Sequence, residues 1–372
     1  MAAILEAVLR VGGLRVGKYT SPHLVDFRER IIIDGRPIAE ENVVDFVARC
    51  SDVVEQTGAT FFEATTAMAF EEFSSQNVDV AVVETGLGGR LDATNVVRPM
   101  VATVTSVGMD HMEYLGDTIE QISAEKAGIF KSGIPAVVGE RDVVRRELLA
   151  RLAHAAGASA VRVVADEVQA SNTEVGMDGV RFDFRSPPLE GRVAVGLRGL
   201  HQVWNTCTAI AALQVAGPRF TPSVAALTGA LGSLELPGRC QIHENIVFDV
   251  AHNPAGTTVL VQTLTEIYGR EEFTVLFCAL RDKDWPGMLR ILRDVAGSFV
   301  FSDAPSAPDA RKWDLDAVAS EARRMGVRHH VISDFGAALM QAIKSGGKVL
   351  VTGSFHTVGD AMLRLQVSPL PR

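Results

Sequence analysis

The sequence is poor in cysteine and lacks a long apolar run. Its four cysteines lie far apart and form no Cys-x-x-Cys pair: Cys50, Cys207, Cys240 and Cys278. This spacing argues against a zinc ribbon and a disulfide scaffold, and it fits a reducing cytosol. No apolar stretch reaches the roughly 18 residues of a membrane-spanning helix. The first residues also lack the basic start and cleavage site of a signal peptide. We therefore expect a cytoplasmic protein with no membrane partner.

An excess of basic residues is also missing. The chain has 36 Lys and Arg against 45 Asp and Glu, a formal net charge of −9. Nucleic-acid-binding domains usually present a basic face, so no nucleic-acid partner is expected. Of the 372 residues, 47% are hydrophobic and 22% are charged, as in an ordinary globular protein. This length suggests two domains, each large enough for its own core.

Short apolar runs alternate with helical patterns in the first part of the chain. Residues 78–86, 100–108 and 133–139 are apolar at both alternating sets of positions, as in strands buried on both faces of a parallel sheet. A helical pattern covers 119–130 between two of these runs. We therefore expect an α/β fold with a mostly parallel sheet. Residues 160–198 contain short, polar-interleaved runs with turn signals, which predict a small antiparallel insert.

A Leu-Pro-Gly break at 236–238 interrupts these patterns and marks the expected domain boundary. A second strand–helix series follows it, with strand-like runs at 245–250, 273–280, 298–303, 329–333 and 348–353. We therefore predict two domains, residues 1–236 and 241–372, the second with a Rossmann-like α/β fold.

Polar residues with possible chemistry follow several strand-like runs. Ligands of open parallel sheets bind outside the carboxyl ends of the strands. Glu84 ends one run and precedes the glycine-rich segment 86–89, His111 follows the next run, and Ser21 follows the run at 14–19. Together they indicate a divalent cation next to a phosphate. Each also has a plainer interpretation as a turn residue or a structural histidine. Because imidazole is unusual for magnesium, manganese or zinc fits the residues equally well.

Two further segments have both a plain and a functional interpretation. Lys126 lies on a predicted helix, where a lysine is usually a solvated surface residue. Residues 249–254 read as a helix start, with Asn253 as the cap and Pro254 in the first turn. That structural role does not exclude a functional Asp249 and His252.

One segment imitates a phosphate-binding loop. Residues 12–20 nearly match G-x-x-x-x-G-K-[ST], but Tyr19 stands where a Ser or Thr should bind the metal. A phosphate loop must follow a strand and open a helix, whereas here a helix precedes the segment and a strand spans it. We therefore interpret it as a helix–strand turn.

Taken together, the motifs resemble the folylpolyglutamate synthase/dihydrofolate synthase family of the Mur ligase superfamily. The matching segments run in order through essentially the whole chain: 19–31 (YTSPHLVDFRERI), 60–63 (TFFE), 82–95 (VVETGLGGRLDATN), 108–131, 201–205 (HQVWN), 237–239 (PGR), 249–254 (DVAHNP), 279–289 and 351–359. YTSPHL and GGRLDATN look like the folate branch rather than the cell-wall ligases. The resemblance implies a first domain built around a P-loop-NTPase-like sheet and a second domain of the glutamate-ligase type.

The resemblance also implies a reaction. The family uses ATP and Mg²⁺ to join a carboxylate to the amine of L-glutamate, with dihydropteroate or a reduced folate as the carboxylate. The γ-phosphate passes to this carboxylate, and the amine attacks the resulting acyl phosphate. Cations are needed because ATP and the carboxylate are both anions. The family default is a monomer.

Site residues follow from the same resemblance, position by position. Ser21, Glu84 and His111 match magnesium ligands. Lys126 matches a catalytic lysine whose carbamate would hold a second magnesium, and His252 matches a catalytic position on the glutamate side. Asn205, Arg239 and Asp249 match ATP contacts. Substrate positions are Thr60, Phe61, Phe62, Glu63, Leu91, Asp92 and Ala93 for the pterin, and Ser354 for glutamate.

The start of the chain departs from the family pattern. In the family, a strand and a Gly-Thr-Asn-Gly-Lys-Gly-Ser loop precede the helix with which this chain opens. From this sequence we expect both to be missing and ATP turnover to be weak, because a phosphate loop supplies several oriented donors. Two alternatives therefore stand beside the folate ligase: a non-catalytic remnant that binds a pterin or a partner, and a ligase of the cell-wall branch.

Overall fold

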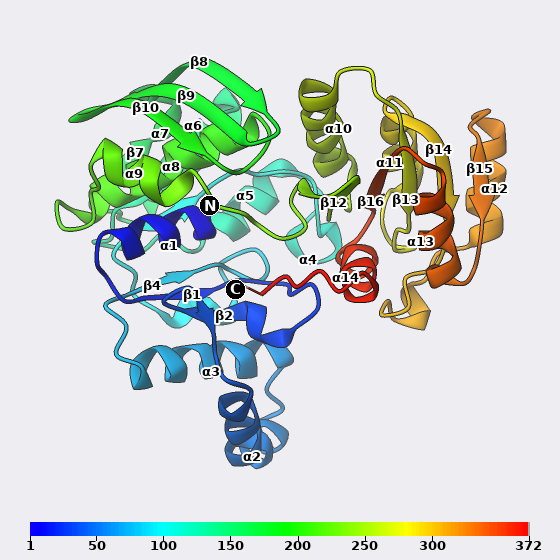
Figure 1. The fold of residues 1–372 in the computed structure, drawn as a ribbon. Coiled ribbons are helices and arrows are strands. Elements are labelled where there is room, and N and C mark those ends of the chain that lie inside the picture. The colour runs from blue at the N-terminus through cyan, green and yellow to red at the C-terminus, as the bar shows by residue number, and fades with distance from the viewer. Residues whose placement is uncertain (371–372) are drawn as a thin grey trace.

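The computed structural model describes residues 1–370, so the last two positions of the predicted second domain lie outside the described residues. Two α/β units lie side by side, and a pair of helices projects from the first (Figure 1). The helices are α1 (Ala2–Val11), α2 (Glu40–Thr57), α3 (Phe61–Ser75), α4 (Met112–Leu115), α5 (Ile119–Ala127), α6 (Val143–Ala155), α7 (Val164–Glu167), α8 (His201–Ala216), α9 (Val224–Leu231), α10 (Pro254–Tyr268), α11 (Trp285–Leu292), α12 (Leu315–Arg324), α13 (Phe335–Lys344) and α14 (Phe355–Arg364). The strands are β1 (Val16–Tyr19), β2 (Ile31–Ile33), β3 (Arg36–Pro37), β4 (Val80–Val83), β5 (Ala102–Val104), β6 (Ala136–Val138), β7 (Val161–Val163), β8 (Gln169–Gly176), β9 (Gly179–Ser186), β10 (Leu189–Val195), β11 (Gln241–His243), β12 (Ile246–Asp249), β13 (Phe273–Phe277), β14 (Ala296–Phe301), β15 (His329–Val331) and β16 (Lys348–Thr352).

The three apolar runs predicted as parallel strands form β4, β5 and β6. β4 pairs in parallel with β1, and the antiparallel strands β2 and β3 extend this sheet in the order β3-β2-β1-β4. β5, β6 and β7 form a separate parallel sheet. Within residues 1–370, β4 pairs only with β1 and β5 only with β6. The α/β class is thus confirmed, with the parallel strands divided between two sheets.

The antiparallel insert is smaller than predicted. β8, β9 and β10 form a three-stranded antiparallel sheet, and alternate side chains of β9 are buried in the core shared with α8. Residues 161–168, predicted as part of this insert, instead form β7 and the short helix α7. β7 pairs in parallel with β6, and Val161 and Val163 pack against the core of the β5–β6–β7 sheet. Their apolar side chains are the physical reason for this correction.

The second unit contains one six-stranded sheet, in the order β11-β12-β16-β13-β14-β15. All pairs from β12 to β15 are parallel, and only β11 joins antiparallel. The five predicted strand runs correspond to β12 to β16, which confirms the Rossmann-like prediction. Its core includes the fully buried Phe248, Phe277 and Phe301. Because both faces of this sheet carry helices, its strands are nearly uniformly apolar.

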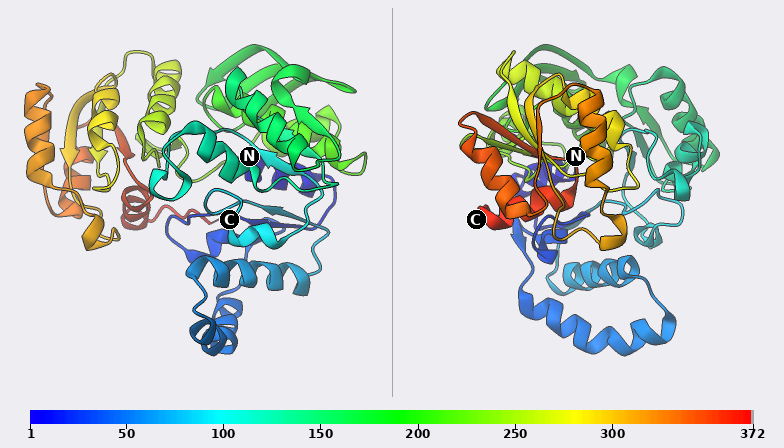
Figure 2. Two further views of the ribbon diagram at one scale, coloured as in Figure 1. Left: turned by 180° about the vertical axis from the view of Figure 1, so that it is seen from behind. Right: turned by 90° about the vertical axis from the view of Figure 1, so that its right-hand side faces the viewer.

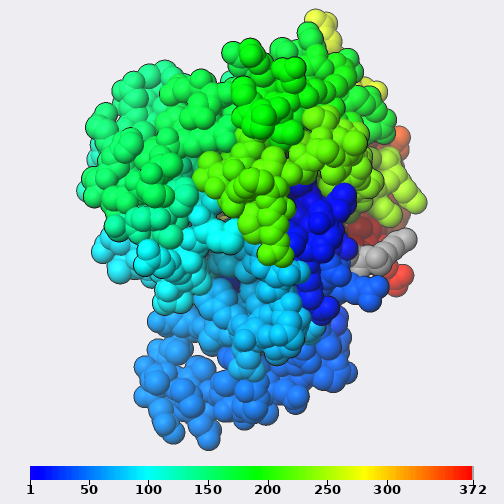
Figure 3. Space-filling view, turned by 90° about the vertical axis from the view of Figure 1, so that its left-hand side faces the viewer, coloured from blue at the N-terminus to red at the C-terminus, as the bar shows by residue number. Residues whose placement is uncertain are grey.

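Helix α1 leads directly into β1, as the sequence predicts for the segment that imitates a phosphate loop. α1 ends at Val11 and β1 begins at Val16, so residues 12–20 form a helix–strand turn and a strand. α1 packs against α9 on one face of the molecule (Figure 3). α2 and α3 form a separate helical layer below the β1–β4 sheet (Figure 2). Within residues 1–370, no helix combines the length and apolar character needed to cross a bilayer.

The two units contact each other through a tight backbone approach. The side chains of Leu24 and Val25, from the loop after β1, pack against the core of the second unit. A Cβ atom placed on Gly359 of α14 would lie only 2.1 Å from the carbonyl oxygen of Leu24, so only glycine allows this approach. We propose that the domain boundary lies between 236 and 241, because the second sheet begins at Gln241 and its core includes none of the helices before that point.

Candidate active site

Ser21 and Glu84 meet at the carboxyl ends of two adjacent parallel strands. β1 and β4 end at Tyr19 and Val83, which are register partners. The backbone N–H of Ser21 donates to Oε2 of Glu84 at 3.0 Å. Glu84 is solvent-exposed, and this bond uses one of its two carboxylate oxygens. This pair of hard oxygen donors suits Mg²⁺ or Mn²⁺.

The amino end of α1 opens toward the same strand ends. Burial lowers the pKa of the Met1 amino group to about 6, and the charges of Glu84 and Arg239 act on it in opposite directions. Glu84 of the first unit and Arg239 of the linker therefore approach one helix end, where backbone N–H groups favour an anion.

Asp110 connects the first unit to the second. It lies in the loop after β5 and accepts from Nδ2 of Asn253 at 2.9 Å and from Nζ of Lys283 at 3.2 Å. Nε2 of His252 lies 3.5 Å from the same carboxylate. Burial opposes ionisation of Asp110, but the hydrogen bond from His252 and the charge of Lys283 outweigh it and lower the pKa of this carboxyl. Asp110 is therefore an ionised anchor between the units.

His111 follows Asp110 and starts the short helix α4 with a left-handed backbone, at φ 51°. Burial lowers the pKa of the His111 imidazole, and Lys283 and Lys126 also lower it against the opposing charge of Asp110. The neutral imidazole can coordinate a metal ion. His111 thus lies within electrostatic reach of Lys126 and of the second unit.

Lys126 is near the end of α5 and partly buried. Burial lowers the pKa of its amine, with Asp110 as the opposing charge. Lys126 is therefore only partly exposed, unlike a lysine on a fully solvated helix face. A buried amine with a lowered pKa carries more of the neutral, nucleophilic form.

Arg239, Asp249 and His252 gather on the second unit's side of the junction. The guanidinium carbon of Arg239 lies 5.4 Å from the ring centre of Phe355, and the His252 ring lies 5.8 Å from the same centre. Asp249 accepts from the backbone N–H groups of Cys240 and Ala251. Burial raises the pKa of Asp249, and the charge of Arg239 opposes this shift. Asn253 caps α10 and Pro254 opens it, as predicted.

Asn205 lies on α8, where its Nδ2 donates to Oε1 of Gln202 at 3.0 Å. The neighbouring His201 is mostly buried, and its Nδ1 has no hydrogen-bond partner within residues 1–370. Burial and, to a smaller extent, the charge of Arg239 lower the pKa of His201 to about 4. An orphaned buried ring nitrogen beside Arg239 fits a polar ligand atom that is absent from the protein alone.

The two predicted pterin segments meet the glycine loop after Glu84. A Cβ atom on Gly86 would lie 3.0 Å from the Phe62 ring and 3.2 Å from Oδ2 of Asp92, so the three segments are in contact. Thr60 and Glu63 form a reciprocal capping box at the start of α3. Leu91 and Phe61 are exposed. Asp92 caps the turn at 93–96, which includes Ala93.

Arg30 lies against this aromatic group. Its guanidinium carbon is 5.2 Å from the ring centre of Phe61 and 5.8 Å from that of Phe62. Its Nε donates to Nδ1 of His23 at 2.8 Å, while Nη1 is buried without a partner in the described chain. Two exposed rings beside an unsatisfied guanidinium group suit a flat, polar-edged ligand.

Ser354 lies at the carboxyl end of β16, where it caps α14. Its hydroxyl group accepts from the backbone N–H of Thr357 at 3.0 Å, and the residue is buried. Ser354 is next to Phe355, which contacts Arg239 and His252. The predicted glutamate-side residues are therefore neighbours.

The structure places the predicted residues in several groups, and not in a preformed metal cluster. Within residues 1–370, no group of three or more His, Cys, Asp and Glu side chains is close enough to hold a metal ion. Ser21 and Glu84 are in contact, whereas His111 interacts with Asp110 and Lys126 instead. The donors present fit a magnesium ion that also uses phosphate oxygens and water.

Sequence reasoning missed three residues of this junction: Asp110, Lys283 and Arg30. Each lies inside a segment that carries the family resemblance, at 108–131, 279–289 and 19–31. Asp110 precedes His111, and Lys283 lies between two aspartates, so charge at strand ends was a usable signal. The pairing of Asp110 with Lys283, which are 173 residues apart, was not visible in the sequence.

Comparisons with known proteins identify the family of this fold. Residues 39–213 match the Mur ligase middle domain, and residues 238–355 match the Mur ligase, glutamate ligase domain. The dihydrofolate synthase/folylpolyglutamate synthase of Bacillus subtilis is 32% identical, covering 98% of this chain and 87% of that protein. The folylpolyglutamate synthase of Mycobacterium tuberculosis, complexed with ADP and AMPPCP, has a TM-score of 0.89 at 30% identity and covers 99% of this chain and 88% of that one. The Escherichia coli FolC structure with DHPP and ADP has a TM-score of 0.85 at 32% identity, over 98% and 85% of the two chains. The chain therefore belongs to the folylpolyglutamate synthase/dihydrofolate synthase family of Mur ligases.

Proposed function

We propose that this protein is an ATP-dependent amide ligase that adds L-glutamate to dihydropteroate, to reduced folates, or to both. The observation that carries the proposal is the junction itself. Glu84, Ser21 and Lys126 of the first unit lie on one side, and Lys283 and His252 of the second unit approach them through Asp110. A reaction between two anions needs positive groups around them, because their negative charges must be neutralised before they can meet.

The proposed chemistry proceeds in two steps. A carboxylate oxygen of the folate attacks the γ-phosphorus of ATP, and ADP leaves, giving an acyl phosphate. The neutral amine of L-glutamate then attacks the acyl carbon, phosphate leaves, and the amine loses a proton. In this proposal Asp249, Arg239 and Asn205 hold the nucleotide, while His252 and Ser354 lie on the glutamate side. The segments at 60–63 and 91–93, with Arg30, bind the pterin.

A divalent cation would be held by Glu84, Ser21 and His111, and it would neutralise phosphate charge. We propose Mg²⁺, because two of these three donors are hard oxygen groups. The Mn ion in the Yersinia pestis relative with AMPPNP supports a divalent site in the family. Lys126 is proposed to be carboxylated, because its buried amine has a lowered pKa. The resulting carbamate would be a further anionic cation ligand.

We further propose that the protein acts as a cytoplasmic monomer. Support for the monomer comes from the family resemblance alone. The cytoplasmic location is supported by the four unpaired cysteines and by the need for ATP.

Glutamate-dependent phosphate release tests the function. The full chain is assayed with dihydropteroate, a reduced folate, or a UDP-linked peptide as acceptor, and products are identified by mass spectrometry. We expect release with a folate acceptor and a product heavier by one glutamyl residue. Release with the UDP-linked peptide alone would favour the cell-wall alternative. Dihydropteroate binding without ATP turnover, in this chain and in a longer version extended upstream, would favour the non-catalytic alternative.

Glu84→Gln is the matched variant for this assay, with Glu113→Gln as its control. Glu113 is an exposed glutamate on α4, next to the junction but outside the proposed site. We expect the first substitution to abolish most of the release and the second to leave it intact.

A further inference from the structure

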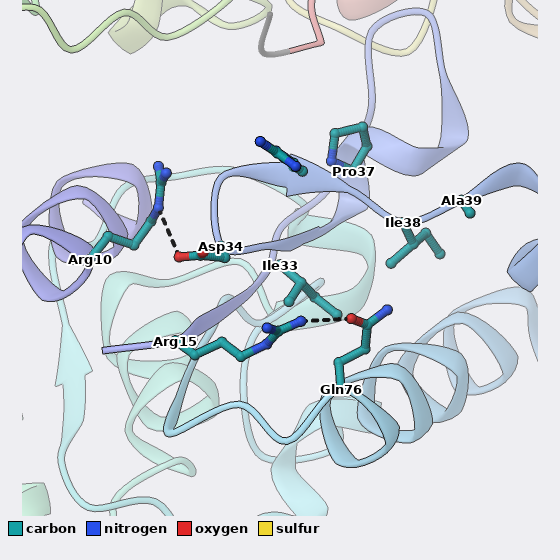
Figure 4. A pocket seen from close by; sticks show the side chains of 9 residues that line it. Arg10, Arg15, Ile33, Asp34, Pro37, Ile38, Ala39 and Gln76 are labelled. Carbon is teal, nitrogen blue, oxygen red and sulfur yellow. Dashed lines mark hydrogen bonds and ion pairs between the residues drawn. The ribbon is translucent and has the colours of Figure 1, made fainter. Parts of the chain in front are cut away.

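A hollow at the opposite end of β1 from Ser21 contains three arginines. We propose that this hollow binds a small polyanion that carries phosphate or carboxylate groups. It has a volume of about 410 Å³ and lies between the end of α1, the start of β1, the β2–β3 turn and the end of α3. We call it the arginine hollow, lined by Arg10, Arg15, Ile33, Asp34, Arg36, Pro37, Ile38, Ala39 and Gln76 (Figure 4). It is separate from the proposed ligase site and does not depend on it.

The charge of the arginine hollow is opposite to that of the whole protein. Three arginines line it with one carboxylate, that of Asp34, and Arg10 also pairs with Glu6 behind the lining, on a chain with a formal net charge of −9. The three arginines come from different elements: Arg10 from α1, Arg15 from the turn before β1, and Arg36 from β3. Within residues 1–370, Arg10 pairs with Asp34 and Glu6, whereas Arg15 and Arg36 form no ion pair, and like charges in one hollow repel unless an anion separates them.

Most hydrogen-bond donors of these arginines are unused. A guanidinium group offers about five N–H donors. Arg10 uses Nε on Oδ1 of Asp34 and Nη1 on Oε1 of Glu6, both at 3.4 Å. Arg15 uses Nη2 on Oε1 of Gln76 at 2.8 Å. Within residues 1–370, the side chain of Arg36 makes no hydrogen bond or ion pair. The remaining donors are available to an oxyanion.

Two of the arginines are held in position. The Asp34-Gly35 turn has positive φ at both residues, 51° and 76°, as in a tight hairpin turn. A Cβ atom on Gly35 would lie 2.2 Å from Nη1 of Arg10, so the guanidinium group of Arg10 packs directly on the bare face of this glycine. Arg15 is fixed by Gln76 and by its backbone N–H bond to Asp79 at 2.8 Å. Figure 4 shows Arg10 beside Asp34 and Arg15 beside Gln76, on separate elements.

The lining determines the class of ligand. Guanidinium groups bind phosphate and carboxylate oxygens through paired N–H donors. The volume lies within the range of about 300–1,000 Å³ typical of small-molecule sites. The apolar lining side chains Ile33 and Ile38 are themselves buried, so an apolar ligand would gain little contact. A compact anion with two or more oxyanion groups fits the three positive side chains best.

Binding to the full-length protein at low ionic strength tests the proposal. The probes are pyrophosphate, tricarballylate and γ-linked triglutamate, each titrated by calorimetry. Because the ligase site also binds anions, the decisive comparison is between variants. Arg36→Ala and Arg15→Ala remove exposed hollow side chains, and Arg151→Ala removes an exposed arginine of α6 as the matched control. Losing one charge-assisted contact should weaken binding about tenfold.

We expect at least one probe to show a saturable event that Arg36→Ala and Arg15→Ala weaken and Arg151→Ala does not. Glutamate-dependent phosphate release should be unchanged in all three variants. Binding of pyrophosphate alone would identify phosphate as the ligand group, and binding of tricarballylate or triglutamate would identify carboxylates. Equal binding of every probe to wild type and to both hollow variants would overturn the proposal, as would the lack of any saturable event.

Discussion

The carboxylate of Asp110 and the amine of Lys283 lie 3.2 Å apart, although 173 residues separate them in sequence. Asp110 belongs to the first domain and Lys283 to the second, in the turn before α11. The exposed fractions of their side chains are 29% and 14%, so the pair is partly withdrawn from water. Asn253 donates to the same carboxylate. His252 lies near it as well, so one side chain of the first domain contacts three from the second.

Asp110→Asn is expected to loosen the two domains. The neutral amide keeps the shape of the side chain but loses the charge that Lys283 and His252 contact. A hydrogen bond to a charged group contributes about 1.5–3 kcal/mol, so the ratio of open to closed forms should rise at least about tenfold. Limited proteolysis at the proposed boundary, between 236 and 241, measures this, together with the radius of gyration from X-ray scattering. Asp117→Asn, at an exposed position after α4, is the control. Unchanged cleavage and radius in Asp110→Asn would contradict the role of this pair.

The sequence predicted the elements better than it predicted the contacts between them. Strand runs such as 245–250 and 348–353 could be recognised because buried parallel strands are apolar throughout. Residues 161–168 were misassigned, because a short half-polar run fits an edge strand of either sheet type. The partners of Asp110 could not be found, because loop contacts over a long sequence separation depend on how two domains pack. Lys126 looked like a surface lysine, since the helix pattern alone does not reveal which face is covered.

Glu84→Gln should weaken binding of the divalent cation. The amide oxygen can still accept from the backbone N–H of Ser21, so the loop keeps its shape while one negative charge is lost. We expect affinity for Mn²⁺ in the presence of ATP to fall at least about tenfold, the effect of losing about 1.4 kcal/mol. Electron paramagnetic resonance of free Mn²⁺ measures it. Glu113→Gln serves as the control on α4. The same Mn²⁺ affinity in Glu84→Gln and wild type would exclude Glu84 as a ligand.

Lys126 should form a carbamate with carbon dioxide. Its nitrogen attacks the carbon of CO₂ and loses a proton, and burial favours this reaction because it lowers the pKa of the amine. We expect a ¹³C signal from the protein in ¹³C-bicarbonate that is absent in Lys126→Arg. Lys344→Arg, an exposed lysine at the end of α13, should leave the signal in place. Detection of the same signal in Lys126→Arg would assign it to another amine.

His201 should make the folded protein sensitive to acid. Burial lowers the pKa of His201 to about 4, with Arg239 and the chain's amino group acting in the same direction. The pKa of an unfolded histidine is about 6.5, so the unfolded state binds the proton more readily between these values. The stabilisation from a neutral His201 is therefore complete above pH ~6.5 and is lost as the pH falls toward 4. Because the ring is not fully buried, we expect this stabilisation to be about 2 kcal/mol, which is less than the full pKa shift would give.

Chemical unfolding of wild type, His201→Gln and His154→Gln between pH 4.5 and 7 measures this contribution. The free energy of unfolding of His201→Gln should fall less steeply toward low pH than that of wild type, because glutamine does not titrate. His154 is an exposed histidine of α6, so its replacement should leave the wild-type slope unchanged. The slope is the useful quantity, since His201→Gln also loses packing at every pH. Parallel pH profiles for wild type and His201→Gln would mean that His201 is protonated as readily in the folded protein as in the unfolded chain.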